Sequence, residues 1–265
     1  MYRIFTDMTG RTIEVNFPLQ RIVSLVPSQT ELLYDLGLAD EVVGITKFCV
    51  HPQDWFRDKK RVGGTKTINI DIVRSLRPDL ILANKEENTK EQIEEMAKSL
   101  PVWVSDIQTM GDAMCMIRNV GVMTGMMNNA MALDREIKAG FKSIKKSQVR
   151  RRVAYFIWRD PWMCAGGDTF ISDMITQMGW ENVFAEDNRY PEVSDEELAS
   201  LDVDLVLLSS EPFPFKEEHI AHIKALLPHT EVMLVDGEMF SWYGSRMKLA
   251  SPYFNGLISS GLVRG

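Results

Sequence analysis

Residues 71–82 read DIVRSLRPDLIL, and residues 196–207, which start 125 positions later, read EELASLDVDLVL. Each copy places a short helical pattern before a run of apolar residues that has the length of a strand. A helix–strand unit that recurs in both halves of a chain indicates that one kind of structural unit is used twice. The repeat therefore predicts two similar α/β lobes.

The same alternation of short apolar runs and helical patterns extends outward from the repeat in both directions. Strands are predicted at residues 21–26, 42–45, 78–83, 101–104, 153–158, 204–209 and 231–235, and a hairpin at residues 2–16. Helices are predicted at residues 32–36, 71–76, 86–100, 173–178, 196–201, 219–227 and 252–262. Ser28 and Glu31 form a predicted capping box for the first of these helices. The alternation is typical of the α/β class with mostly parallel sheets.

Residues 109–147 interrupt this alternation, because they contain no proline and carry apolar or small residues mostly three or four positions apart. That spacing predicts one long helix, which at roughly 1.5 Å per residue would extend about 55–60 Å. Gly111, Gly121 and Gly125 are compatible with close packing or a bend. The predicted fold is thus α/β, with a first lobe at 1–108, a long linking helix at 109–150 and a second lobe at 151–265.

The composition is that of a folded globular protein, with 45% hydrophobic residues, 25% charged residues and a net charge of −7. A pI near 5.3 without an extended basic run argues against nucleic acid as a partner. Three well-separated cysteines without a C-x-x-C motif argue against a disulfide framework or a zinc ribbon. One short basic cluster is read as a solvated helix end followed by a linker; it comprises Lys142, Lys145, Lys146, Arg150, Arg151 and Arg152.

No apolar run is long enough to span a bilayer, and residues 1–16 lack the apolar core of a signal peptide. We therefore expect either a cytoplasmic protein or a periplasmic one whose export segment has been removed. The signature motifs of nucleotide-binding, α/β-hydrolase and zinc-protease sites are absent, so we expect a protein that is not an enzyme. His219 and His222 share a predicted helix face without a third ligand nearby, so no metal site is predicted.

Aromatic and polar residues gather in three loops that follow predicted strands, at residues 48–52, 158–162 and 240–246. Ligands of open α/β sheets bind outside the carboxyl ends of the strands. A cleft between two lobes is also a common place for a small molecule. The loops therefore predict a ligand site in an inter-lobe cleft. The residues expected to contact the ligand are Phe48, His51, Trp158, Arg159, Trp162, Trp242, Tyr243 and Arg246.

Several segments resemble the helical-backbone (class III) substrate-binding proteins of ABC importers, which serve the uptake of cobalamin, iron siderophores and heme. The segments are RIVSLVPSQTE at 21–31, Leu36–Gly37, VVGI at 42–45, LRPDLIL at 76–82 and GWENVF at 179–184. The match covers nearly the whole chain, from about residue 21 to residue 262, and is most similar to the cobalamin-binding branch. The resemblance implies two α/β lobes bridged by one long helix.

The resemblance implies that ligand-facing loops lie at 48–52, 65–67, 84–88, 158–167 and 238–246, which adds Lys66, Asn84 and Glu238 to the expected contacts. Asn84 stands where the cobalamin-binding branch carries a tryptophan, and the loop before residue 71 also lacks one. The resemblance further implies that Asp71 and Glu196, one in each lobe, dock on arginines of a membrane permease. A carboxylate in the first turn of a helix also stabilises the helix itself.

We therefore expect a monomeric binding protein for cobalamin or a related metal chelate, with no cofactor of its own and no protein–metal bond, which docks on an ABC permease. Two alternatives stay open. An iron-siderophore or heme receptor would use Tyr243 or His51 as an axial ligand in the heme case. A cytoplasmic corrinoid-handling protein or enzyme would use loop carboxylates for acid–base chemistry, namely Asp160, Asp168, Glu211, Asp236 and Glu238.

Overall fold

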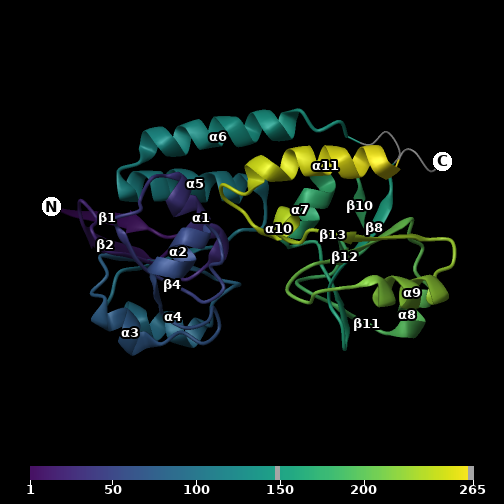
Figure 1. Ribbon diagram of the computed structural model, residues 1–265, viewed down its shortest axis with the longest axis horizontal. Helices are drawn as coiled ribbons and strands as arrows, with labels where there is room; N and C mark the ends of the chain where they lie inside the picture. Colours follow the sequence, from purple (N-terminus) through teal and green to yellow (C-terminus); the bar gives the residue numbers. More distant parts are fainter. Residues whose placement is uncertain (147–149, 262–265) are drawn as a thin grey trace. The chain divides into compact units, whose positions relative to one another are not determined.

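The computed structural model describes residues 1–146 and 150–261, and these residues form two compact units (Figure 1). The first unit contains residues 1–107, 111–136 and 243–246, and the other described residues belong to the second. The chain therefore enters the first unit three times. This division differs from the predicted one, because residues 111–136 group with the first unit and residues 137–142 with the second.

The first unit is built on a five-stranded parallel sheet in the order β5-β4-β3-β6-β7. Two of its three inner strands, β3 and β6, are buried at every residue, as expected for a parallel sheet covered on both faces. The strands are β3 (Ile22–Ser24), β4 (Val42–Ile45), β5 (Lys60–Arg61), β6 (Leu80–Asn84) and β7 (Val102–Ser105). The helices between them are α1 (Pro27–Asp35), α2 (Gln53–Asp58), α3 (Ile70–Ser75) and α4 (Lys90–Ala97).

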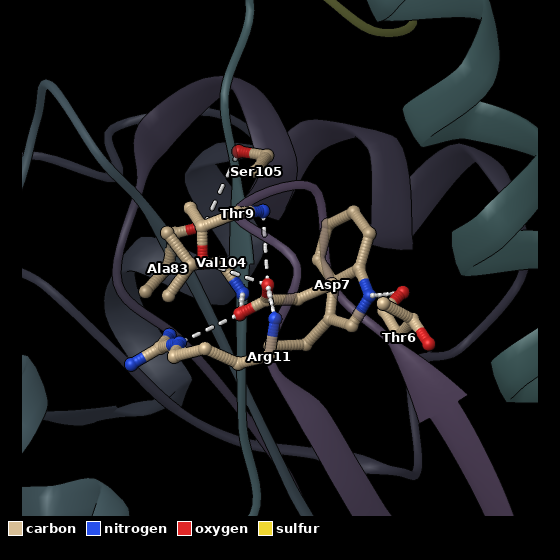
Figure 2. A network of polar contacts seen from close by, with 8 residues as sticks. Thr6, Asp7, Thr9, Arg11, Ala83, Val104 and Ser105 are labelled. Carbon is tan, nitrogen blue, oxygen red and sulfur yellow. Dashed lines mark hydrogen bonds and ion pairs between the residues drawn. The ribbon is translucent and has the colours of Figure 1, made fainter.

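The predicted hairpin is confirmed as β1 (Tyr2–Thr6) paired antiparallel with β2 (Thr12–Asn16). Figure 2 shows how the buried carboxylate of Asp7 holds the turn between them. Asp7 accepts hydrogen bonds from the backbone N–H of Thr9 and Arg11, each at 2.9 Å, and from Nε of Arg11 at 2.9 Å. The N–H of Met8 then donates to the carbonyl of Val104 in β7 at 3.0 Å, which attaches the hairpin to the sheet.

The second unit is built on a six-stranded sheet in the order β11-β9-β8-β12-β13, with β10 pairing β8. The strands β8, β10, β12 and β13 run parallel, whereas β9 and β11 are antiparallel additions at one side. Its strands are β8 (Arg152–Trp158), β9 (Trp162–Cys164), β10 (Glu181–Asn182), β11 (Glu192–Val193), β12 (Leu205–Ser209) and β13 (Glu231–Val235). Its helices are α7 (Phe170–Gln177), α8 (Asp195–Ala199), α9 (Glu217–Leu226), α10 (Glu238–Ser241) and α11 (Met247–Gly261).

The internal repeat is confirmed, because its two copies occupy equivalent places in the two sheets. In the first unit α3 precedes β6, which lies between β3 and β7; in the second α8 precedes β12, which lies between β8 and β13. Each short helix starts at a side-chain cap. Asn69 accepts from the N–H of Ile72, and Ser194 forms a capping box with Glu197.

The prediction of one long helix at 109–147 is wrong, since the segment forms α5 (Met110–Thr124) and α6 (Met127–Lys142). Gly125 separates them with a φ of +77°, a left-handed conformation that glycine adopts without a Cβ clash. Residue 121 of α5 packs closely against Ala130 of α6, where a Cβ on Gly121 would collide with that of Ala130. The absence of a side chain at Gly121 therefore allows α6 to pack against α5. Periodicity missed this break because both helices bury apolar faces at the same spacing on either side of it.

Several other helix starts differ from the prediction: α7 begins at Phe170 rather than at residue 173, and α11 at Met247 rather than at residue 252. Helix α1 begins at Pro27, with Val26 as its N-cap and no side-chain cap, so Ser28 and Glu31 do not form the expected capping box. Helix α4 begins at Lys90 rather than at residue 86, because the preceding loop is held by asparagine side chains. The predicted end of the last helix at 262 and the middle of the basic linker, 147–149, lie outside the described residues. No described helix has the length and apolar character to cross a bilayer.

Candidate ligand-binding site

Each unit has a set of loops at the carboxyl ends of its parallel strands, where ligands of open α/β sheets bind. We call residues 46–52, 63–67 and 84–88 the first rim, which belongs to the first unit, and residues 158–162, 209–215 and 235–242 the second rim, which belongs to the second unit. Each rim is described by itself. Most of the predicted contact residues lie in one of the two.

Asn84, at the end of β6, is buried, and its side chain forms hydrogen bonds within the first unit. Its Nδ2 donates to the carbonyl and the hydroxyl of Ser105 at 3.2 and 3.0 Å. Its Oδ1 accepts from the N–H groups of Glu86 and Glu87 at 2.8 and 3.0 Å. These four bonds use both polar atoms of the amide, and the contact of Asn84 with a ligand stays a prediction.

Asn88 joins the two outer loops of the first rim. Its Oδ1 accepts from the N–H of Asn84 at 2.9 Å, and its Nδ2 donates to the carbonyl of Thr65 at 3.0 Å. Lys66, in the loop at 63–67, is exposed and donates a hydrogen bond to the carbonyl of Glu86 at 2.5 Å. The loops at 63–67 and 84–88 are therefore held together before any ligand is bound.

Phe48 presents the main exposed aromatic ring of the first rim, with half of its surface accessible. Next to it Cys49 is buried and bonded to the hydroxyls of Thr30 and Thr46, at 3.1 and 3.2 Å, and burial raises the pKa of its thiol. The loop is thus anchored by Cys49 while the ring of Phe48 stays accessible. His51, at the end of this loop, is half-buried.

Tyr243 and Arg246 lie in the short segment that belongs to the first unit, and both are buried. Arg246 forms two bonds to the carboxylate of Glu31 in α1, at 2.9 Å from Nε and 2.8 Å from Nη2. Burial raises the pKa of Glu31 and outweighs the opposing effect of Arg246. Burial also raises the pKa of the Tyr243 hydroxyl. Both side chains are packed in the first unit, and their contact with a ligand stays a prediction.

Trp158, the last residue of β8, is the exposed aromatic residue of the second rim, with 40% of its surface accessible. Its ring packs edge-on against Phe213, with centroids 5.7 Å apart. Phe213 follows β12 and was not among the predicted contacts, although its position after a buried strand was a usable signal. The two rings form an aromatic surface at the strand ends.

Trp162 is 2% exposed and packs in the core of the second unit, and its contact with a ligand stays a prediction. Phe215 stacks on it at 6.0 Å, and the guanidinium of Arg159 lies 4.2 Å from its ring centre. Its Nε1 donates to Asp195 at 2.8 Å. Arg159 also pairs with Asp160 at 2.6 Å, so both predicted contacts already have partners.

Glu211, which follows β12, is the central polar residue of the second rim. Its Oε1 accepts from the hydroxyl of Ser241 at 2.7 Å and from Nε1 of the buried Trp242 at 2.8 Å. Burial raises the pKa of Glu211, and the nearby carboxylates of Glu238 and Asp236 raise it further. Three acidic groups therefore lie close together in this rim.

The two predicted docking carboxylates are exposed in their own units. Asp71 lies in the first turn of α3 with 94% of its side chain accessible, and Glu196 lies in the first turn of α8. Both also stand where a negative charge favours the helix dipole. The two histidines of α9 are occupied otherwise, since His219 accepts from the N–H of Lys216 and His222 lies 3.4 Å from Asp195. No group of potential metal ligands occurs among the described residues.

Comparison with known proteins places this geometry in context. The periplasmic binding protein family matches residues 22–226. An uncharacterized ABC transporter substrate-binding lipoprotein of Bacillus subtilis is 27% identical over 214 residues, which cover 76% of this chain and 67% of the relative. A vitamin B12-binding protein of Vibrio campbellii is 25% identical over 211 residues, which cover 78% of this chain and 75% of the relative.

Solved structures share the fold at lower sequence identity. The periplasmic vitamin B12-binding protein of Vibrio cholerae superposes with a TM-score of 0.76 at 20% identity, covering 93% of this chain and 99% of that one. A periplasmic heme-binding protein of the same organism superposes with a TM-score of 0.77 at 19% identity, covering 90% and 98%. The architecture is therefore shared by proteins whose names state different ligands.

Proposed function

Because the chain belongs to the periplasmic binding protein family, we propose that it is the substrate-binding component of an ABC importer for a corrinoid such as cobalamin. Its vitamin B12-binding relative from Vibrio campbellii, which matches over more than three quarters of this chain, supports that ligand class. The names of the relatives also support a site of action outside the cytoplasmic membrane. We propose that the chain binds its ligand without catalysing a reaction on it.

The exposed ring of Trp158, backed by Phe213 at the carboxyl end of β8, carries this proposal. A large accessible tryptophan at a strand end supplies contact area to a broad, flat macrocycle while little side-chain entropy is lost. Phe48 provides a comparable exposed ring in the first rim. Heme is less well supported as the ligand, since Tyr243, one of its two candidate axial ligands, is buried with a raised pKa.

Titration of the purified protein with cyanocobalamin tests the proposal, followed by calorimetry and by tryptophan fluorescence. We expect saturable binding, and Trp158→Ala should weaken it about tenfold through the loss of a buried aromatic contact. Tyr2→Ala is the matched control, because Tyr2 is also an exposed aromatic residue but lies on the hairpin outside both rims. Tight binding of hemin in place of cyanocobalamin would reassign the ligand, and binding of no chelate would refute the proposal.

The docking role of Asp71 and Glu196 is proposed together with this function. The variant Asp71→Arg with Glu196→Arg should abolish ligand uptake by cells that depend on this protein and leave cyanocobalamin affinity unchanged. The matched control is Glu91→Arg with Glu218→Arg, which reverses one exposed carboxylate in the first turn of a helix in each unit. Loss of uptake in both double variants, or loss of ligand binding in the first, would refute the docking assignment.

A further inference from the structure

The carboxyl group of Glu211 is held by only one of its two oxygens. Its Oε1 receives both available bonds, from Ser241 and from Trp242. No described residue donates a hydrogen bond to Oε2 or forms an ion pair with the group. A carboxylate oxygen accepts hydrogen bonds readily, and Oε2 is not buried away from solvent, so an incoming donor can reach it. The second rim thus contains a fixed acceptor with unused capacity.

The position of Glu211 is set by its backbone as well as by its side chain. Ser209, at the end of β12, donates to the Glu211 carbonyl at 2.5 Å and accepts from the Glu211 N–H at 3.2 Å. The hydroxyl of Tyr155, buried in β8, donates in turn to Ser209 at 3.1 Å. Glu211 is therefore oriented by two neighbouring strands, and a site on rigid elements discriminates ligands better than one on a free loop.

The charges of the second rim are mostly negative. The second rim contains four carboxylates and one cation, and that cation, Arg159, is paired with Asp160. Asp236 directly follows strand β13, and its side chain accepts a hydrogen bond from the N–H of Glu238 at 3.1 Å. Both carboxylates oppose ionisation of Glu211. An anionic ligand group placed here would face like charges, whereas a cation or an N–H donor would be stabilised.

We propose that Glu211 is a specificity-determining residue, which selects metal chelates that present amide N–H or cationic groups to the second rim and rejects those that present carboxylates. This inference rests on the proposed function and narrows its ligand class. Ser241 and Trp242 are positioning residues for Glu211. Corrinoids that carry side-chain amides fit this selection, whereas heme carries two propionates that would face the acidic rim.

The test uses ligands that differ by one group. Cyanocobalamin and its monocarboxylic acids, made by hydrolysis of one side-chain amide, are titrated into the wild-type protein. We expect at least one acid isomer to bind about tenfold more weakly than cyanocobalamin, because an amide donor becomes an anion. In Glu211→Gln this difference should shrink to about threefold or less, since the glutamine amide accepts a bond without carrying charge.

Two further variants test whether the discrimination depends on Glu211 itself and on its orientation. Glu218→Gln removes an exposed carboxylate of the same unit outside the rim and should retain the full discrimination. Ser241→Ala removes one of the two donors to Oε1 but keeps the charge of Glu211, so its discrimination should fall between those of the wild type and Glu211→Gln. Thermal unfolding of each variant establishes that it is folded before the titrations are compared.

The outcomes separate this inference from the proposed function. Equal binding of the amide and all acid isomers by the wild type, or unchanged discrimination in Glu211→Gln, would overturn the role of Glu211 while corrinoid binding stands. Tighter binding of hemin than of cyanocobalamin would also overturn it, with chelate binding retained. If the wild type binds neither cyanocobalamin nor hemin nor ferric siderophores, the proposed function fails and the role of Glu211 fails with it.

Discussion

Arg246 and Glu31 are 215 residues apart in the chain, yet the guanidinium donates to both oxygens of the carboxylate, at 2.9 and 2.8 Å. The pair lies within the first unit and attaches the segment 243–246 to α1. Only 9% of the Arg246 side chain and 17% of the Glu31 side chain are accessible. The capping box that Glu31 was expected to form is replaced by this long-range ion pair.

Removal of one partner from this ion pair should be more harmful than removal of both. Arg246→Met leaves Glu31 buried without its cation and should lower the free energy of unfolding by about 3 kcal/mol. Arg246→Met combined with Glu31→Leu should recover most of that loss, since burial already disfavours the charged form of Glu31. Urea unfolding of the two single variants and the double variant measures the coupling. Additive losses in the double variant would contradict the prediction.

The break between α5 and α6 depends on the backbone conformation of Gly125. Gly125→Ala should lower the free energy of unfolding by about 2 kcal/mol, because a Cβ at positive φ is strained. It would also lie 3.3 Å from Cζ of Phe17. Gly10→Ala is the control for strain alone, since Gly10 has a φ of +88° and no atom within 4 Å of the added Cβ. Thermal unfolding should show a larger loss for Gly125→Ala; equal losses would show that the Phe17 contact is unimportant.

Asn84 should act on the first rim through its hydrogen bonds to the backbone. Asn84→Ala removes the acceptor of two N–H groups and the donor to Ser105, and should cost about 2 kcal/mol of stability. Asn129→Ala removes a single bond to the carbonyl of Leu36 and should cost about 1 kcal/mol. Amide hydrogen exchange of residues 85–88 should accelerate only in Asn84→Ala. Unchanged exchange there would contradict the positioning role.

Trp162 should contribute to stability rather than to ligand binding. Trp162→Phe removes the bond from Nε1 to Asp195 and should cost about 1 kcal/mol at neutral pH while cyanocobalamin affinity stays constant. That bond is the main cause of the lowered pKa of Asp195, whose ordinary value is 3.8. A lowered folded-state pKa contributes stability above the unfolded-state value and loses it as the pH falls, so the two proteins should converge in acid. A weakened affinity at constant stability would restore the ligand role.

The raised pKa of Glu211 predicts the opposite pH dependence. Between the ordinary value of 4.5 and the raised folded-state value, the folded protein keeps the proton that the unfolded chain has lost. Stability contributed by Glu211 is therefore present at low pH and lost as the pH rises through that window. The glutamine in Glu211→Gln does not titrate. The unfolding temperature of this variant should therefore increase relative to that of the wild type as the pH rises from 4.5. Parallel pH profiles of the two proteins would contradict the assignment.

Local patterns in the sequence determined the class of fold and its repeated unit. Apolar runs of strand length between helical patterns specify buried parallel strands, and the copies at 71–82 and 196–207 become α3–β6 and α8–β12. These features are readable because each depends on neighbours within about a dozen residues. The position of Trp158 at the end of β8 belongs to the same category, because the strand and its end are local.

Tertiary structure alone decided which loop residues are accessible and which are used internally. Trp162 and Asn84 carry the same local signals as Trp158 and Lys66, but partners far along the chain bury the first two. The two donors to Glu211, Ser241 and Trp242, lie 30 and 31 positions further along the chain. Arg246 and its partner Glu31 are separated by 215 positions. Periodicity cannot report such pairs, because burial and electrostatic environment arise only when distant strands are brought together. The sequence alone thus determined the scaffold, and packing determined the chemistry of the rims.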